Sequence, residues 1–344
     1  MVLDGHHPDT IARAADALAQ GQLIGLPTET VYGLAADADN PSAVAHIFAA
    51  KGRPADHPLI VHVADAQGHP QGPSAAMAHY AQAVPVFAQQ LIEAFWPGPL
   101  TLILPCRPGI AQAATGGQAT IGLRCPAHPV AQALLQACLQ RQPPIWGLAA
   151  PSANKFGRIS PTTAAHVASE FGDDLLVLDG GACAVGIEST IIDLSRDDGF
   201  PPRLLRPGHI TPEQIATVIG VMPEIQNSGG APRVSGSLDA HYAPLTPMRV
   251  VATAQLDAVS HELQTRDARF GLLAYSLLPV GIRPHALRQL SSEPEDYARG
   301  LYAALRELDQ AGNEVIVVEA IPDAPEWAAV ADRMRRAACG SGTA

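Results

Sequence analysis

Short apolar runs alternate with amphipathic helical patterns through the first two-thirds of the chain. The runs are rich in Leu, Ile, Val and Thr, which is typical of buried or half-buried strands. They lie at residues 23–26, 59–63, 101–104, 120–124, 145–149, 175–178 and 190–194. Helical patterns fall between them, at residues 41–50, 86–95, 129–139, 161–171 and 212–219. This alternation predicts an α/β domain built on a sheet.

Two of the predicted helices have marked starts. Ser160 precedes Pro161, a residue favoured at the first helical position, so Ser160 is the predicted cap of the helix over 161–171. The sequence TPEQ at residues 211–214 fits a capping box, in which side chain and backbone satisfy each other at the helix start.

The alternation is interrupted at residues 223–247, where NSGGAP (227–232) and SGS (235–237) are turn and linker sequences. A smaller pattern follows, which predicts a first domain over residues 1–222 and a small Rossmann-like α/β domain over residues 248–340. The linker over 223–247 contains the aromatic sequence HYAP (241–244), and both a lid and a plain tether fit it. The second domain has predicted strands near 249–252, 270–274 and 314–318, and helices near 256–264, 294–310 and 326–338.

The composition is that of an ordinary globular chain, and the net charge limits the kinds of partner that it can bind. The 344 residues are 47% hydrophobic and 16% charged, far from the composition of disordered chains. The net charge of -11 argues against a surface that grips nucleic acid broadly, although a local basic cleft is compatible with it. No leader and no run of about 20 apolar residues is seen, so we expect a cytoplasmic protein without a membrane span.

The cysteines and lysines are both informative through their spacing and number. Five cysteines without a C-x-x-C pair favour neither a disulfide framework nor a zinc site. Only Lys51 and Lys155 are lysines among 22 basic residues. Two explanations fit the scarcity of lysine: a general drift of the sequence toward arginine, and a specific need for a compact ammonium group at one of these two positions. The sequence alone does not distinguish the two explanations.

Three segments place polar side chains directly after or before predicted strands. PTETVYGL at residues 27–34 follows the first strand and carries two threonine hydroxyls and a carboxylate. PSANK at residues 151–155 follows another, and GIEST at residues 186–190 leads into a third. Ligands in α/β folds commonly bind at strand ends, whereas the same residues also form ordinary turns and helix caps.

Two further segments carry cations beside glycine and proline. KGRP at residues 51–54 closes a predicted helix, and RPG lies at residues 206–208. Cations at a helix end can simply complement the helix dipole. Because glycine and proline fix the backbone, both cations of KGRP could instead converge on one anion, as a polyphosphate requires. Neither a P-loop nor a G-x-G-x-x-G fingerprint is present.

Taken in order, and extended to residues 27–34, 51–63, 152–161, 186–190 and 206–208, these five motifs resemble those of the YrdC-like family of threonylcarbamoyl-AMP synthases over about residues 10–220. The second domain and the HYAP linker are similar to the longer, two-domain form of that family. The resemblance implies an α/β fold with a twisted mixed sheet and a concave, basic cavity. It also implies synthesis of threonylcarbamoyl-adenylate from L-threonine, bicarbonate and ATP, with release of pyrophosphate, for threonylcarbamoyl modification of adenosine 37 in tRNA.

The resemblance further implies the site residues and the partners. Lys51 and Arg53 are expected to meet phosphates and to serve the reaction. The ATP side would comprise Lys51, Arg53, His57, Thr120, Ser152, Asn154, Ser160, Arg206 and Tyr242, and the threonine side would comprise Thr30, His62, Arg124, Ala150 and Ser189. For His62 and Thr120, a role in the core explains a strand position equally well. Magnesium would arrive with ATP rather than at a protein site, and a tRNA threonylcarbamoyl transferase would use the product; direct tRNA binding is left open.

Two departures and two alternatives accompany the resemblance. His57 stands where the family usually has Asn, and residues 235–240 (SGSLDA) replace the usual basic stretch before HYAP. An RNA-binding module that uses the basic cavity is the main alternative function, against which the acidic composition argues. Carbamoyl-transfer relatives are a second alternative, but they are expected to carry acylphosphatase-like or zinc-finger segments, and the cysteine spacing excludes the latter.

Overall fold

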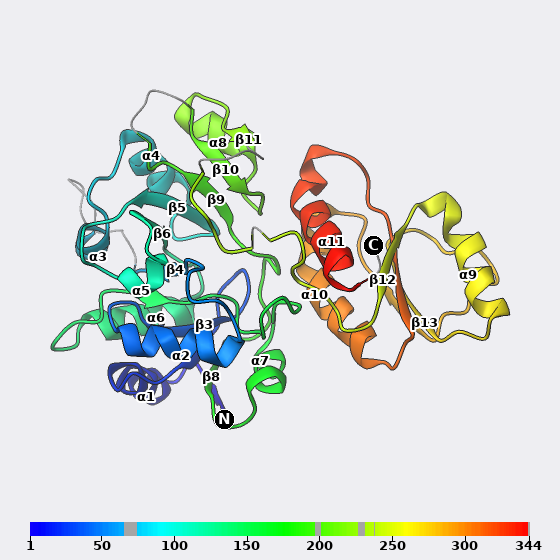
Figure 1. Cartoon of the computed structure of the whole chain (residues 1–344), viewed down its shortest axis with the longest axis horizontal. Coiled ribbons are helices and arrows are strands. Elements are labelled where there is room, and N and C mark those ends of the chain that lie inside the picture. Colours follow the sequence, from blue (N-terminus) through cyan, green and yellow to red (C-terminus); the bar gives the residue numbers. More distant parts are fainter. Residues whose placement is uncertain (65–73, 197–200, 226–230, 237, 343–344) are drawn as a thin grey trace. The chain divides into compact units, whose positions relative to one another are not determined.

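A computed structural model describes residues 1–64, 74–196, 201–225, 231–236 and 238–342. Parts of the predicted linker (226–230 and 237) and the last two residues of the chain lie outside the described residues. The chain forms two compact units (Figure 1). The first comprises residues 1–155, 161–184 and 188–237, and the second comprises 156–160, 185–187 and 238–344. No helix in the described part is long and apolar enough to cross a membrane.

The first unit is built on one mixed sheet of eleven strands in the order β1-β8-β2-β3-β7-β4-β6-β5-β9-β10-β11. Parallel pairs such as β4 with β6 occur beside antiparallel pairs such as β5 with β6. The strands are β1 (Val2–Asp4), β2 (Ile24–Leu26), β3 (Gly33–Asp37), β4 (Ile60–His62), β5 (Leu100–Pro105), β6 (Thr120–Arg124), β7 (Leu148–Ala149), β8 (Leu176–Asp179), β9 (Thr190–Asp193), β10 (Arg203–Arg206) and β11 (Glu224–Ile225).

Helices cover both faces of this sheet because its buried strands alternate between two apolar cores. In β3, Leu34 and Ala36 join one core, whereas Ala35 joins the other. The second core packs helices α1 (Pro8–Ala19) and α6 (Pro129–Leu139). The first core takes its side chains from α2 (Pro41–Lys51), α3 (Ala75–Tyr80), α4 (Val86–Phe95), α5 (Gln112–Thr115), α7 (Ala164–Phe171) and α8 (Pro212–Ile219).

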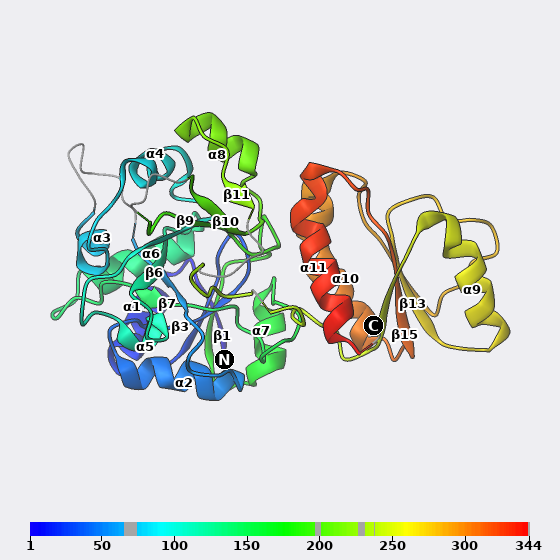
Figure 2. The same ribbon diagram turned by 45° about the horizontal axis from the view of Figure 1, so that its top comes forward.

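The second unit is a small parallel sheet with helices on both sides (Figure 2). Its strand order is β12-β15-β13-β14, with α9 on one face and α10 and α11 on the other. The elements are β12 (Met248–Val251), α9 (Leu256–Thr265), β13 (Phe270–Ala274), β14 (Ala286–Gln289), α10 (Pro294–Gln310), β15 (Val315–Glu319) and α11 (Ala328–Gly340), with short 3₁₀ turns at Thr253–Gln255 and Pro325–Trp327.

The α/β class predicted from the alternation is confirmed, whereas some predicted element bounds differ and some short elements, such as β1, were not predicted. The capping box at Thr211 and Gln214 is formed on both sides. The predicted start of α7 at Ser160 is wrong, because Thr163 caps that helix by accepting a hydrogen bond from the backbone N–H of His166 at 3.3 Å. The predicted strand over 145–149 contracts to Leu148–Ala149.

Candidate active site

The turn between β2 and β3 is fixed by its own hydroxyl groups. Thr28 is buried, and its Oγ1 accepts hydrogen bonds from the backbone N–H groups of Thr30 at 3.2 Å and Val31 at 3.3 Å. The same hydroxyl donates to the carbonyl of Val31 at 2.6 Å. An ST-turn of this kind holds the backbone without help from a ligand, so the side chains of Glu29 and Thr30 project from a rigid base.

Alternation within the sheet brings the predicted threonine side together. In β6, Ile121 and Leu123 enter the core, so Thr120, Gly122 and Arg124 face the other way. His62 of β4 is paired in register with Arg124, and parallel neighbours in register share a face of the sheet. Ala150 directly follows β7, and its N–H donates to the carbonyl of Ile60 in β4.

Arg124 is the charged centre of this group and is almost fully buried. Its NH1 donates to Thr30 Oγ1 at 2.7 Å, and its Nε donates to the carbonyl of Gly98 at 3.2 Å. Its NH2 lies 2.6 Å from Glu29 Oε1, in an ion pair with both side chains at least nine-tenths buried. Burial first, and then the charge of Arg124, lowers the pKa of His62 to about 3, so His62 is neutral at physiological pH.

Ser189, from the predicted threonine side, contacts Arg206, from the predicted ATP side. Its hydroxyl lies 2.8 Å from Thr101 Oγ1 and accepts from NH2 of Arg206 at 3.1 Å. Arg206 Nε also donates to the Ser189 carbonyl at 3.0 Å. This approach explains the glycine of the RPG motif: a Cβ at Gly208 would lie 2.4 Å from the backbone nitrogen of Thr190.

The two predicted phosphate-binding arginines meet at one serine of the linker. Arg53 NH2 donates to Ser235 Oγ at 3.2 Å, and Arg206 NH1 donates to the Ser235 carbonyl at 2.9 Å. Ser235 in turn donates to the carbonyl of Pro58 at 2.9 Å. The neighbouring Val234 packs against Ile103, on the face of β5 opposite the first core. The linker therefore supplies a residue to the arginine pair within the first unit.

Lys51 ends helix α2 and is buried with its ammonium group engaged. Its Nζ donates to the carbonyls of Ser152 at 2.6 Å and Asn154 at 2.5 Å. Gly52 ends the helix in the left-handed conformation, with a φ of 65°. Burial first, and then the charge of Arg53, lowers the pKa of Lys51 well below its usual value. In this structure Lys51 therefore ties helix α2 to the loop that carries Ser152 and Asn154.

The remaining predicted residues lie in separate segments of the chain. Thr120 begins β6 and is half-buried, and His57 is half-buried in the loop before β4. Burial, and then the charge of Arg53, lowers the pKa of His57. Ser160 and Tyr242 belong to the second unit. There Tyr242 has a φ of 61°, which is uncommon for a bulky side chain. The Arg333 guanidinium carbon lies 5.5 Å from the centroid of the Tyr242 ring, in a cation–π contact.

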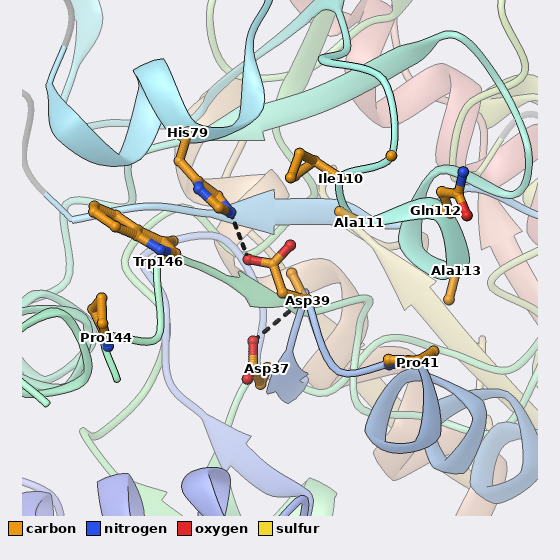
Figure 3. A pocket seen from close by; sticks show the side chains of 12 residues that line it. Asp37, Asp39, Pro41, His79, Ile110, Ala111, Gln112, Ala113, Pro144 and Trp146 are labelled. Atoms are coloured by element: carbon orange, nitrogen blue, oxygen red, sulfur yellow. Dashed lines mark hydrogen bonds and ion pairs between the residues drawn. The ribbon is translucent and has the colours of Figure 1, made fainter. Parts of the chain in front are cut away.

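A cavity elsewhere in the first unit contains none of the predicted site residues. It encloses about 440 Å³ between β3, α2 and the loop before α5 (Figure 3). Asp39 pairs with His79 at 2.8 Å, and the His79 ring stacks on Trp146 with centroids 4.9 Å apart. Among the residues that the structure describes, no group of three His, Cys, Asp or Glu side chains could hold a metal ion.

Family models match nearly the whole chain. One described as "Telomere recombination", for the Sua5, YciO and YrdC proteins, matches residues 16–208, and the threonylcarbamoyl-AMP synthase C-terminal domain matches residues 210–339. The chain belongs to the Sua5-type threonylcarbamoyl-AMP synthase family. This confirms the resemblance drawn from the five motifs.

Relatives of the Sua5 type align with the chain from end to end. The Pyrococcus abyssi threonylcarbamoyl-AMP synthase is 38% identical over 332 residues, covering 94% of this chain and 92% of its own. The Bacillus subtilis enzyme is 37% identical, covering 96% and 93%. The crystal structure of P. abyssi Sua5 complexed with L-threonine superimposes with a TM-score of 0.87 at 33% identity, covering 99% of this chain and 98% of that one.

Three side chains that contact the predicted site residues are not themselves among the predicted residues. Glu29 lies inside the motif at residues 27–34, but a carboxylate 95 positions before its arginine partner along the chain leaves no periodic signal in the sequence. Thr101 was assigned only to a strand. Ser235 was read as linker sequence, because a serine beside glycine is ordinary in a turn.

Proposed function

We propose that the chain synthesises threonylcarbamoyl-adenylate from L-threonine, bicarbonate and ATP, with release of pyrophosphate, for the threonylcarbamoyl modification of adenosine 37 in tRNA. The Ser189 bridge carries the proposal. Ser189, which the proposal assigns to the amino acid together with Arg124, accepts hydrogen bonds at its carbonyl and hydroxyl, at 3.0 and 3.1 Å, from Arg206, one of the two arginines suited to phosphates.

The chemistry requires two anions to be held together. Threonine and bicarbonate give a carbamate and water; a carbamate oxygen then bonds to the α-phosphorus of ATP while the bond from that phosphorus to the leaving pyrophosphate breaks. No covalent enzyme intermediate is needed, so positioning and charge stabilisation supply the rate enhancement. Arg53 and Arg206 would stabilise the negative charge that builds on the phosphates.

The threonine side offers complementary groups for the amino acid. Arg124 would bind the carboxylate, beside the Thr30 hydroxyl that already accepts from it. His62 Nδ1 is buried without a hydrogen-bond partner among the described residues, so the neutral ring can serve a hydroxyl group. P. abyssi Sua5, which aligns over 98% of its length, is known in complex with L-threonine, and this supports the assignment of substrate.

The expected accessory partners follow from the substrates and the product. Magnesium would enter with ATP and be held mainly by phosphate oxygens. The product is a mixed anhydride that reacts with nucleophiles, so a transferase that delivers the threonylcarbamoyl group to tRNA should consume it.

The test is release of pyrophosphate from ATP by the purified chain, with L-threonine and bicarbonate supplied separately and together. We expect release only when both are present, and an adenylate product that carries label from threonine. Turnover that is indifferent to threonine would exclude the proposed reaction. L-serine and L-valine serve as matched controls, because each lacks one of the two groups on the threonine β-carbon.

A further inference from the structure

Glu29 is a buried carboxylate that the proposed reaction does not use. The side chain is 7% exposed, and it projects from the turn that Thr28 holds rigid. Its Oε1 lies 2.6 Å from NH2 of Arg124, the guanidinium assigned to the amino-acid carboxylate. A carboxylate at this position can act on the substrate through Arg124.

The contacts of Arg124 come from three separate segments and define one orientation of its planar group. Nε donates to the carbonyl of Gly98 and NH1 to the hydroxyl of Thr30, whereas NH2 lies 2.6 Å from Glu29 in an ion pair without hydrogen-bond geometry. Two hydrogen bonds and one charge contact restrain the planar group against rotation about its long axis. Without Glu29 the NH2 side would lose its anchor, and the bidentate face offered to a carboxylate would no longer be set before the substrate arrives.

Charge balance gives Glu29 a second role. Arg124 is 4% exposed, and an isolated buried cation costs several kcal/mol. Among the ion pairs of the described residues, Glu29 is the acidic partner of Arg124. His62, its neighbour in register, is neutral and therefore adds no second positive charge.

The ion pair between Glu29 and Arg124 lacks the hydrogen bonds that a purely structural buried ion pair would have. Both carboxylate oxygens of Glu29 are buried, and neither accepts a hydrogen bond from the described residues, so Glu29 meets Arg124 as a charge contact alone. Leaving a buried carboxylate oxygen unsatisfied is costly, and such costs are typical of functional sites. An apolar pair of similar volume would stabilise this turn at least as well.

We propose that Glu29 is a positioning residue for the amino-acid substrate, holding the Arg124 guanidinium in the orientation that binds the threonine carboxylate. The inference rests on the proposed function for the identity of the substrate. It predicts that Glu29 affects threonine binding and leaves ATP binding unchanged.

The test compares Glu29→Gln and Glu29→Asp with the wild-type chain. Threonine affinity is measured by calorimetry, and KM values for threonine and ATP by pyrophosphate release. We expect Glu29→Gln to weaken threonine binding and to raise its KM about tenfold or more, the scale of one charged hydrogen bond. The KM for ATP should stay within about twofold, because the contacts described for Arg53 and Arg206 are with Pro58, Ser189 and Ser235 rather than Glu29. Glu29→Asp, which keeps the charge, should recover part of the loss.

A double-mutant cycle with Arg124→Gln separates positioning from general damage. If Glu29 acts through Arg124, then Glu29→Gln should add no further loss of threonine affinity in the Arg124→Gln background. The double variant also removes both buried charges, so it should fold even if Glu29→Gln alone does not. Asp39→Asn, which breaks a half-buried ion pair with His79 in the cavity of Figure 3, is the matched control.

Unchanged threonine affinity in Glu29→Gln, additive losses in the cycle, or an equal rise in both KM values would overturn the inference. Failure of the proposed function is recognised separately. In that case the wild-type chain releases no threonine-dependent pyrophosphate, while calorimetry still reports whether Glu29 controls the binding of threonine itself.

Discussion

At the scale of single residues, the two lysines of the chain are both engaged by backbone carbonyls. Lys51 Nζ donates to the carbonyls of Ser152 and Asn154, and Lys155 Nζ donates to the carbonyl of Ala50 at 2.7 Å. A compact ammonium can donate to two carbonyls in a space where a planar guanidinium would need more room. This favours a specific need for lysine at position 51 over general drift toward arginine.

Arg53 is the residue whose loss should cost most on the ATP side. We expect Arg53→Ala to lower turnover by roughly 10²–10³, the scale for removing one preorganised charge-stabilising group. The measurement is pyrophosphate release at saturating substrates. Arg141→Ala is the control, because the Arg141 side chain pairs with Asp16 at a partly exposed position and is not among the predicted site residues. An unchanged rate in Arg53→Ala would remove this side chain from the site.

His62 should make the fold sensitive to acid. Its pKa is about 3 in the folded chain, lowered by burial and by Arg124, against about 6.5 when unfolded. The unfolded state therefore binds the extra proton, and stability present above pH 6.5 is lost as the pH falls toward 3, by up to about 1.4 kcal/mol per pH unit. Denaturant melts of His62→Gln should show a shallower decline between pH 6 and 4. An identical decline would contradict the buried, neutral assignment.

At the scale of elements, Glu319 closes the end of β15 in the second unit. The side chain is fully buried and accepts from the backbone N–H groups of Tyr275 at 2.9 Å and Ser276 at 3.0 Å, and from the hydroxyl of Thr253 at 2.9 Å. Open parallel sheets commonly bind ligands at the carboxyl ends of their strands. Here an internal carboxylate holds the loops that follow β12 and β13 at that edge.

Replacing Glu319 with Gln should destabilise the second unit by about 2 kcal/mol, since charged hydrogen bonds to backbone amides are lost. Burial alone would raise the pKa of Glu319, but the hydrogen bonds from Ser276, Tyr275 and Thr253 outweigh it and lower the pKa. The contribution is therefore present above about pH 4.5 and fades in more acidic solution. Thermal melts at pH 7 measure the loss, with exposed Glu314→Gln as the control, for which no clear change is expected.

Sequence patterns predicted the helices and strands whose burial alternates or whose capping residues are local. They did not predict elements and contacts that depend on residues far away in the sequence. The capping box at Thr211 needs only four residues, and its helix was predicted with the observed bounds. Strand β1 was missed, because Val2–Asp4 is three residues long and depends on pairing with β8. The contacts of Glu29 with Arg124, and of Ser235 with both arginines, join distant positions through the fold, so no local spacing reveals them.

At the scale of the whole molecule, each compact unit is built from segments that are not continuous in the sequence. Residues 156–160 and 185–187 precede the linker but belong to the second unit. Within that unit Arg158 pairs with Asp309 at 2.9 Å, and Arg306 donates to the carbonyl of Ile159. A Cβ at Gly186 would lie 2.5 Å from the backbone of Arg299, which marks a close approach of the chain. The second unit is therefore completed by two segments from the catalytic part of the sequence.

A chain cut after residue 236 should consequently fold less stably than the same residues do in the full-length protein. It keeps Ser235 and every strand of the large sheet, but segments 156–160 and 185–187 lose the groups that bury them. We expect its melting temperature to fall by about 4–8 °C, the change that about 2 kcal/mol produces in a unit of this size. Asp309→Asn in the full-length chain is the partial control, because it breaks the pair with Arg158 without cutting the chain. If the shortened chain melted at the full-length temperature, the two segments would not depend on the second unit for their stability.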